Sequence, residues 1–145
     1  MIDLKGLARF DTPTVCNVIE LAGLRSKADG YADSRLKACY PGLPSMVGYA
    51  TTATFRSAMP PADGVAYGGI EEQLETFNRL PGPAVVVFQD LDDPPAAATF
   101  GEILCTTYQR FGAAGLVTSG TGRDLQMVEP LRFPCFVTGT QGAHG

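Results

Sequence analysis

Arg123 and Asp124 form an adjacent cation and anion that could bind a charged ligand. The planar guanidinium of arginine can hold a carboxylate through two parallel hydrogen bonds. An aspartate oxygen is a hard ligand for Mg²⁺ or a similar cation. Both residues follow the segment SGTG at 119–122, which we interpret as a flexible turn. The pair therefore indicates a site for an anionic ligand and a divalent metal. On spacing alone, an exposed ion pair in which Asp124 merely caps the next helix stays an open alternative.

Two elements before this pair would position it. The sequence predicts a helix that starts after Gly101 and stops at Gly112, followed by a fully buried strand over 113–118. The expected apolar face of the helix consists of Ile103, Leu104, Thr107, Tyr108 and Phe111. Ligands of α/β folds bind where strands end, and the free N–H groups at a helix start, here Glu102 to Leu104, attract anions. The helix start and Arg123 should therefore converge on one ligand.

The rest of the chain alternates helices and strands. The expected elements are a helix from Thr12 to Gly23, a strand over 47–55, a helix over 69–80, a strand over 84–89, and a strand over 135–138 after a short helix. The first helix should bury Val15, Val18, Ile19 and Ala22, and the strand over 47–55 should lie near the middle of the sheet. Because no linker or repeat divides the sequence, the pattern predicts one α/β domain over residues 1–145, with a central sheet and flanking helices.

Other polar residues are weaker candidates for the site. The run Asp90-Leu91-Asp92-Asp93 lacks the ligand spacing of a calcium loop, so we expect it to border the pocket or cap turns, with Asp90 its best site residue. Arg56 is interpreted as a solvated loop arginine, and the single histidine, His144, is expected to be exposed at the tail. No lysine has the setting of a Schiff-base residue, which favours metal over imine catalysis.

Composition narrows the functional classes. The 145 residues are 45% hydrophobic and 18% charged, with a net charge of −4 and no run of Lys or Arg. A conventional nucleic-acid-binding surface is therefore not expected. The N-terminal segment has no long apolar run, so we expect neither a signal peptide nor a membrane span, and the cytoplasm is the default location. Four scattered cysteines without a Cys-x-x-Cys pair argue against a zinc site or a disulfide framework.

Six segments carry a more specific signal. They are DTPTV at 11–15, VGYATT at 47–52, GEIL at 101–104, GAAGLV at 112–117, Gly120 through Arg123-Asp124, and FPCF at 133–136. In this order they resemble the RraA-like family. That family includes regulators of ribonuclease E activity and class II aldolases of 4-hydroxy-4-methyl-2-oxoglutarate and 4-carboxy-4-hydroxy-2-oxoadipate.

The resemblance implies residue roles. Backbone groups of Gly101, Glu102, Ile103 and Leu104 and the side chain of Arg123 would hold a pyruvate-like carboxylate. Asp124 would bind Mg²⁺ or Mn²⁺ through a water-rich shell, so that Arg123 and Asp124 are the implied catalytic residues. The implied fold is the swivelling phosphohistidine-domain-like α/β/α arrangement, assembled as a homotrimer or a pair of trimers. The implied activity is a metal-dependent lyase that cleaves a 4-hydroxy-2-oxo diacid to pyruvate and a second oxo acid, or decarboxylates oxaloacetate.

Two departures from the aldolase pattern keep a second function open. Met127 stands where that pattern has an acidic residue, and Glu129 is the nearest acid. Compared with the family pattern, the sequence also lacks a C-terminal β-rich segment. The alternative is a non-catalytic regulator that binds a ribonuclease or another protein. A methyltransferase is less favoured, because no glycine-rich cofactor loop follows the first strand.

Overall fold

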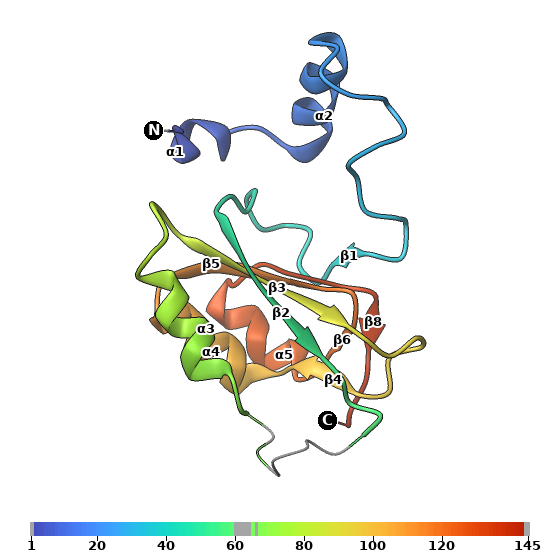
Figure 1. The fold of residues 1–145 in the computed structure, drawn as a ribbon, viewed down its shortest axis with the longest axis vertical. Helices are drawn as coiled ribbons and strands as arrows, with labels where there is room; N and C mark the ends of the chain where they lie inside the picture. The colour runs from blue at the N-terminus through green and yellow to red at the C-terminus, as the bar shows by residue number, and fades with distance from the viewer. Residues whose placement is uncertain (1, 60–64, 66, 144–145) are drawn as a thin grey trace.

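Parallel strands form the centre of the molecule (Figure 1). The computed structural model describes residues 2–59, 65 and 67–143; His144 lies outside them. The main sheet has the order β1-β7-β5-β3-β2 in the described part of the chain. Its strands are β1 (Lys37–Ala38), β2 (Tyr49–Phe55), β3 (Ala84–Asp90), β5 (Ala113–Thr118) and β7 (Cys135–Val137). All neighbours pair in parallel except β1, which runs antiparallel to β7.

The buried strands are β3 and β5, as their continuous apolar sequences predict. Val86 of β3 and Leu116 of β5 are fully buried and pair with each other in the sheet register. The strand over 47–55 was also predicted correctly, but its expected place was wrong. β2 pairs only with β3 in the described residues and so forms an edge of the sheet. Its alternating exposed and less exposed positions fit that edge.

A second, smaller sheet continues the first. Its strands are β4 (Ala98–Phe100), β6 (Thr121–Gly122) and β8 (Gly139–Thr140), paired in parallel in that order. Along the chain, β4 comes after β3, β6 after β5 and β8 after β7. Each strand of the small sheet is therefore the next strand in the sequence after one strand of the main sheet. The prediction of a flexible turn over 119–122 was therefore wrong. Thr121 and Gly122 are buried in β6, and a Cβ on Gly122 would come within 2.6 Å of the Phe100 ring.

Three helices cover one face of the main sheet (Figure 1). They are α3 (Ile70–Phe77), α4 (Glu102–Arg110) and α5 (Leu125–Val128), the last followed by a 3₁₀ turn at Glu129–Leu131. The helix over 101–111 is confirmed, and Gly112 ends it with a φ of +90°. Its predicted apolar face is partly wrong. Cys105 and Tyr108 point into the core, whereas Ile103 is 70% exposed, because α4 packs on β5 along the Cys105–Tyr108 side.

Residues 2–24 form an N-terminal arm at the amino ends of β2 and β3 (Figure 1). It contains α1 (Leu4–Leu7) and α2 (Thr12–Leu21). The predicted helix exists and ends before Gly23, whose φ is +63°. Its N-cap is Asp11, which accepts a hydrogen bond from the Thr14 N–H at 2.9 Å. The predicted buried face was wrong: α2 has no buried residue, since Val18 and Ala22 are exposed and Val15 and Ile19 are only half-buried.

The described elements make a mixed α/β domain with a central sheet and flanking helices, as predicted. None of the helices in this part of the chain has the length and apolar character that a membrane span requires.

Candidate functional site

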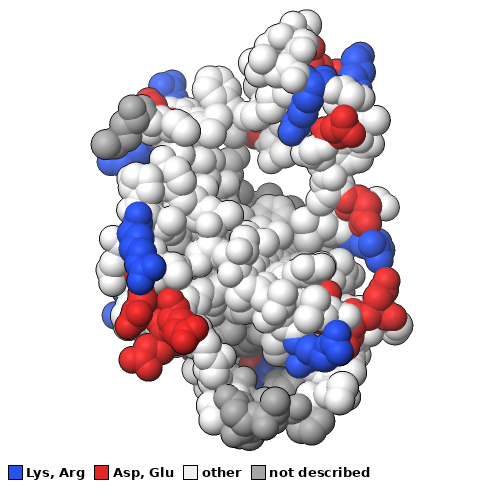
Figure 2. Space-filling view, in the orientation of Figure 1, with Lys and Arg blue, Asp and Glu red and all other residues white. Residues whose placement is uncertain are grey.

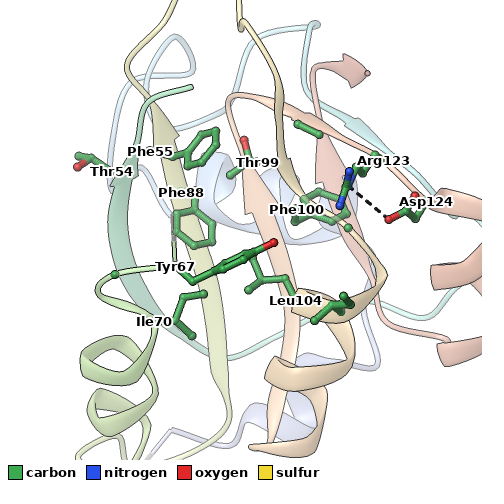
Figure 3. Close-up of a pocket in the computed structure, with 14 residues that line it drawn as sticks. Thr54, Phe55, Tyr67, Ile70, Phe88, Thr99, Phe100, Leu104, Arg123 and Asp124 are labelled. Carbon is green, nitrogen blue, oxygen red and sulfur yellow. Dashed lines mark ion pairs between the residues drawn. The ribbon is translucent and has the colours of Figure 1, made fainter. Parts of the chain in front are cut away.

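A pocket of about 120 Å³ lies toward the carboxyl ends of β2 and β3. Its walls come from six places in the chain: the end of β2, Phe88 of β3, the β4 strand, the beginnings of α3 and α4, and the Arg123-Asp124 pair (Figure 3). This is the end of a parallel sheet where α/β folds bind ligands. The structure therefore brings the pair to the helix start that the sequence singled out.

The start of α4 is open to an anion. Gly101 is the N-cap, and no side chain caps the first turn of the helix. The first helical N–H groups have no partner within the helix, since the i→i−4 ladder begins with the Cys105 N–H bonded to the Gly101 carbonyl at 3.1 Å. Together with the helix dipole, these donors favour negative charge at Glu102 to Leu104.

Arg123 and Asp124 lie directly over Gly101. A Cβ added to Gly101 would be 2.6 Å from Asp124 Oδ2 and 3.1 Å from Arg123 Nε. The Arg123 N–H donates to the Phe100 carbonyl at 3.0 Å, which fixes the backbone of the pair to β4. The absence of a side chain at Gly101 thus leaves room for the side chains of Arg123 and Asp124.

The two side chains also form an ion pair. Arg123 Nε and Asp124 Oδ2 are 3.4 Å apart, and the side chains are 27% and 43% exposed (Figure 3). At this exposure the pair contributes little to stability, on the order of 0–1 kcal/mol. The remaining guanidinium N–H groups and the second carboxylate oxygen are the groups that a ligand could engage.

Asp124 has an unusual backbone conformation. Its φ is 56° and its ψ 27°, the left-handed region, which residues other than Gly adopt uncommonly and which Asp tolerates better than most. It occupies the N-cap position of α5, yet its side chain makes no capping hydrogen bond. The capping role left open by the sequence is therefore not the one that its carboxylate performs. Backbone conformations of this kind concentrate at functional sites, which motivates a ligand-binding role.

The residues present fit only a water-rich metal site. Among the residues described, no group of three or more His, Cys, Asp or Glu side chains could hold a metal ion. Mg²⁺ usually keeps several waters and binds through one or two carboxylates together with oxygens of its substrate. Asp124 provides one such carboxylate, so a bound substrate and water would have to supply the other ligands.

The apolar walls of the pocket were not found from the sequence. Phe55, Ile70 and Phe88 line one side, and Phe100 and Leu104 lie closer to Arg123 (Figure 3). The polar groups among these walls are the hydroxyls of Thr54, Tyr67 and Thr99. A signal existed, since Phe55 ends the predicted strand over 47–55 and Phe88 lies near the end of the strand over 84–89. Both are therefore at the edge of the sheet where a ligand is expected.

The candidates Asp90 and Arg56 lie outside this pocket. Asp90 lines a separate cleft of about 960 Å³, where its N–H donates to Ser119 Oγ and its Oδ1 accepts from the Asp92 N–H, both at 2.9 Å. Burial raises the pKa of the Asp90 carboxyl. Arg56 is half exposed, as predicted, with its Nε 3.8 Å from Asp92 Oδ1. The sequence predicted that this run would border the pocket or cap turns. Asp92 does cap a turn, because its carboxylate accepts hydrogen bonds from the N–H groups of Ser57 and Ala58.

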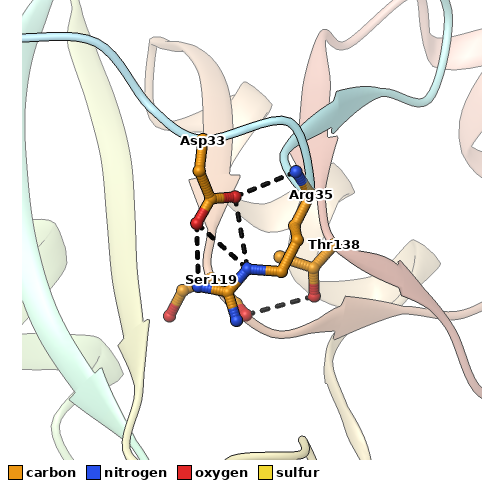
Figure 4. A network of polar contacts seen from close by, with 4 residues as sticks. All are labelled: Asp33, Arg35, Ser119 and Thr138. Carbon is orange, nitrogen blue, oxygen red and sulfur yellow. Dashed lines mark hydrogen bonds and ion pairs between the residues drawn. The ribbon is translucent and has the colours of Figure 1, made fainter. Parts of the chain in front are cut away.

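One wall of that cleft is an exposed polar network (Figure 4). Asp33 and Arg35 form an ion pair at 2.8 Å, and hydrogen bonds from Arg35 lower the pKa of the Asp33 carboxyl. Thr138 Oγ1 donates to the Ser119 carbonyl at 3.2 Å and so joins the residue between β7 and β8 to the turn after β5. Because the charges of Asp33 and Arg35 pair with each other, we interpret this network as one that stabilises a loop.

Charged side chains are sparse on the face of the molecule in Figure 2. Acidic side chains gather over α3, which carries the exposed residues Glu71, Glu72 and Glu75. The basic ones lie apart from each other. Nucleic-acid backbones bind to clustered Lys and Arg. The described residues on this face form no such cluster.

The fold and pocket define a class: an α/β domain with a small pocket at its strand ends, lined by the start of α4 and by Arg123 and Asp124. The chain belongs to the RraA-like family (Aldolase/RraA), whose model matches residues 12–144. This confirms the family inferred from the six segments, and the family includes both aldolases and regulators. A search of curated proteins gave no match.

Solved structures agree with this assignment. RraAS2 of Streptomyces coelicolor, described as an unusual member of the RNase ES inhibitor RraA protein family, is 28% identical with a TM-score of 0.68; the match covers 98% of this chain and 64% of that one. A protein described among novel cellulases from gut-associated microbes has a TM-score of 0.76 at 16% identity, over 98% of this chain and 61% of that one. The RNA-processing inhibitor RraA from a Thermus species has a TM-score of 0.60 at 15% identity, over 94% and 72%. The last two, at such identities, show the fold alone. The chain spans under two thirds of the length of the first two.

Proposed function

We propose that this protein is a divalent-metal-dependent lyase of the class II aldolase type that acts on small 2-oxo acids. The reaction is cleavage of a 4-hydroxy-2-oxo acid, of the diacid type implied by the family, to pyruvate and a second oxo acid; oxaloacetate decarboxylation is a related activity. The observation that carries the proposal is the placement of Arg123 and Asp124 over Gly101 at the open start of α4. Membership of a family that contains such aldolases supports it.

The residues of the chain have separable tasks in this reaction. The N–H groups of Glu102 to Leu104 and the Arg123 guanidinium bind the carboxylate beside the 2-oxo group. Arg123 also offsets the negative charge that grows as an enolate forms. A divalent metal at Asp124 would supply Lewis-acid polarisation of the 2-oxo oxygen. The phenylalanine walls exclude water, which strengthens the electrostatic interactions inside the pocket.

The binding half of the proposal is tested with oxalate, a planar dianion that resembles the pyruvate enolate. In calorimetric titrations with Mg²⁺, Arg123→Ala should weaken oxalate binding by roughly 1.5–3 kcal/mol, the scale of a hydrogen bond to a charged group. Arg123→Lys should recover only part of this, since a point charge cannot reproduce the planar fork. The matched control is Arg56→Ala, a cation outside the pocket. Equal affinity in all four proteins, or binding indifferent to metal, would contradict the site.

The catalytic half is tested by pyruvate release. Activity should disappear with EDTA and return with Mg²⁺ or Mn²⁺. Asp124→Asn should keep the fold and lose activity, because a neutral amide oxygen holds a hard cation less well. Full activity in Asp124→Asn would remove this residue from the metal site.

The second candidate function is an RraA-type regulator that binds a ribonuclease or another protein. Two observations favour it. Met127, where the aldolase pattern has an acid, is 65% exposed on α5, and the 28% identical Streptomyces structure is described within an RNase ES inhibitor family. A pull-down with a purified RNase E-type ribonuclease separates the two functions. Capture that Arg123→Ala leaves unchanged, together with no pyruvate release, would favour the regulator.

A further inference from the structure

Resting on the proposed function, we propose that Asp90 takes up the proton of the substrate's C4 hydroxyl during aldol cleavage, and that Thr99 passes this proton from the pocket to Asp90. Thr99 lines the pocket, whereas Asp90 lines the separate cleft, so Asp90 acts through Thr99 and does not touch the substrate. This task is distinct from those of Arg123 and Asp124, which are to hold the substrate carboxylate and the metal.

The cleavage needs a proton acceptor that the pocket does not itself provide. Among the described residues that line the pocket, Asp124 is the single carboxylate, and none is a histidine or a lysine. Asp124 is paired with Arg123 and is the residue proposed to hold the metal. The hydroxyls of Thr54 and Tyr67 are neutral and exposed, and they stay available to hydrogen-bond the second carboxylate of a diacid. The acceptor therefore has to lie behind the wall of the pocket.

Thr99 connects that wall to the interior. It belongs to β4, lines the pocket and is 6% exposed (Figure 3). Behind it, the buried Thr118 Oγ1 accepts from the Gly120 N–H at 2.9 Å and donates to Thr99 Oγ1 at 3.2 Å. Because Thr99 Oγ1 is the acceptor of this bond, its own hydrogen is available to a second acceptor.

Asp90 Oδ2 is an acceptor without a donor. Asp90 is 9% exposed, and its Oδ1 accepts from the Asp92 N–H, but its buried Oδ2 has no hydrogen-bond partner. A Cβ added to Gly120 would collide with both Asp90 Oδ2 and Thr99 Oγ1, so the two oxygens flank one point. Buried polar atoms without partners are rare, and one explanation for them is a catalytic role. The hydrogen of Thr99 and the oxygen of Asp90 thus complete a path from the pocket to Asp90.

The surroundings of Asp90 suit an acceptor. Burial raises the pKa of its carboxyl, which makes the carboxylate a stronger base than an exposed aspartate. The charged residues that share its cleft are Asp33, Arg35, Lys37, Asp92 and Asp93. Asp33 pairs with Arg35, and no ion pair in the described part of the chain involves Asp90. Because Asp90 lines this cleft, its proton can exchange with water there.

The proton transfers balance over the reaction. The C4 hydroxyl gives its proton to Thr99 Oγ1 as Thr99 gives its own proton to Asp90 Oδ2. The C3–C4 bond breaks, C4 becomes the carbonyl of the second oxo acid, and the released electron pair forms the enolate of pyruvate. The enolate then takes a proton from water at C3, and Asp90 returns its proton to water.

Oxaloacetate decarboxylation is the internal reference for a test. Oxaloacetate has no C4 hydroxyl, and it loses CO₂ to give the same enolate without a proton leaving the substrate. Asp90→Asn should therefore lower the ratio of two kcat values, that of 4-hydroxy-4-methyl-2-oxoglutarate cleavage to that of decarboxylation, by about 100-fold, the lower end of the range for general acid–base catalysis. Thr99→Val should lower this ratio likewise, whereas Thr99→Ser, which keeps the hydroxyl, should retain most of it.

Two further measurements serve as controls. Asp93→Asn, an exposed carboxylate of the same cleft, should leave both kcat values unchanged. Calorimetric titration of oxalate with Mg²⁺ should give Asp90→Asn the affinity of wild type, because oxalate has no C4 hydroxyl. Circular dichroism shows which variants are folded, and either folded variant, Asp90→Asn or Thr99→Val, decides the question.

The outcomes separate this inference from the proposed function. If the two variants lower both reactions by the same factor, Asp90 and Thr99 only support the shape of the pocket and the proton transfer is wrong. Full cleavage by a folded Asp90→Asn protein also overturns it. In either case, loss of both reactions in Arg123→Ala would leave the proposed function standing. If wild type does not cleave the hydroxy acid, the proposed function fails and this inference fails with it.

Discussion

The part of the molecule around the pocket and the N-terminal arm both contain helices with an apolar face, but the two regions differ in how far those apolar side chains are buried. We call the first region, which holds α3, α4 and the strands they cover, the pocket end. At the pocket end, α3 and α4 pack on the sheet, and Tyr108 and Leu116 are fully buried. In the arm, α2 has an equally regular helical pattern, yet Val18 is 59% and Leu21 89% exposed. The spacing of apolar residues along the sequence therefore predicts that a helix has an apolar face. Whether that face becomes buried depends on residues far away in the sequence.

The largest expected difference between the two regions is in stability. Leu116→Ala removes a fully buried side chain and should lower the free energy of unfolding by about 2–5 kcal/mol. The same substitution in the arm, Leu21→Ala, should change it by less than about 0.5 kcal/mol in dilute protein. Urea unfolding of both variants and wild type measures this. A loss at Leu21 close to that at Leu116 would show that the arm is packed in solution.

The exposed apolar face of the arm leads to the next prediction, that the protein is a homo-oligomer, a trimer or a hexamer. Exposed apolar surface of this kind is usually covered in an assembly. Burial of a leucine contributes about 1.5–3 kcal/mol, so Leu21→Asp should weaken association by at least tenfold. Light scattering after size-exclusion chromatography is the measurement, with Glu20→Asp as the control on the same helix. A wild-type monomer at micromolar concentration would contradict the prediction.

A smaller effect is expected from one methyl group at the pocket end. Gly101→Ala should place its Cβ against Asp124 Oδ2 and Arg123 Nε and so push the ends of two flexible side chains away. Gly101 has an extended backbone, with φ −143° and ψ −164°, which alanine adopts without strain. We therefore expect a folded protein whose affinity for oxalate falls by roughly tenfold, about 1.4 kcal/mol.

The control for this substitution lies in the loop between β1 and β2, where an added Cβ meets open space. Gly42 has no atom within 4 Å of an added Cβ, so Gly42→Ala should leave oxalate binding unchanged. Unaltered binding in Gly101→Ala would show that Arg123 and Asp124 do not act from the position over the start of α4.

Local signals in the sequence predicted the framework of the pocket end. The strand over 113–118 matches β5 residue for residue, because an uninterrupted apolar run bounded by Gly112 is a purely local pattern. The convergence of Arg123 and Asp124 on the start of α4 also followed from sequence, since ends of parallel strands and starts of following helices meet at one edge. Their roles in binding and catalysis stay a prediction.

Features that depend on pairing between distant residues were missed. The strands β4 and β6 have three and two residues, too few for any periodicity, and form because Phe100 and Gly122 pair across the second sheet. The pocket wall joins Phe55, Ile70 and Phe88 from three separate elements. No spacing along the chain encodes that proximity, so the apolar end of the site could be seen only in the folded structure.

The smallest predicted effect concerns a carboxylate beside the pocket. Asp90 is buried at the end of β3, and its Oδ2 has no hydrogen-bond partner. This oxygen and Thr99 Oγ1 both lie against Gly120, since a Cβ there would be 2.4 Å and 2.3 Å from them. Burial raises the pKa of Asp90 above its ordinary value of 3.8. Near neutral pH the ionised carboxylate therefore loses water contacts, and its hydrogen bonds do not fully replace them.

The pH dependence follows from proton binding. Between pH 3.8 and the raised pKa, the folded state binds more protons than the unfolded state, so stability falls as pH rises through this window. The protonated form thus contributes stability below pH 3.8 that is lost above the raised pKa. Asp90→Asn should stabilise the protein at pH 7 and lose this advantage at pH 3.5, because the amide keeps the bond from the Asp92 N–H without the charge. Urea unfolding at both pH values measures this, with exposed Asp93→Asn as the control. An Asp90→Asn protein that is less stable than wild type at pH 7 would indicate that the charge has a partner, such as a cation held in the cleft of Asp33 and Asp90.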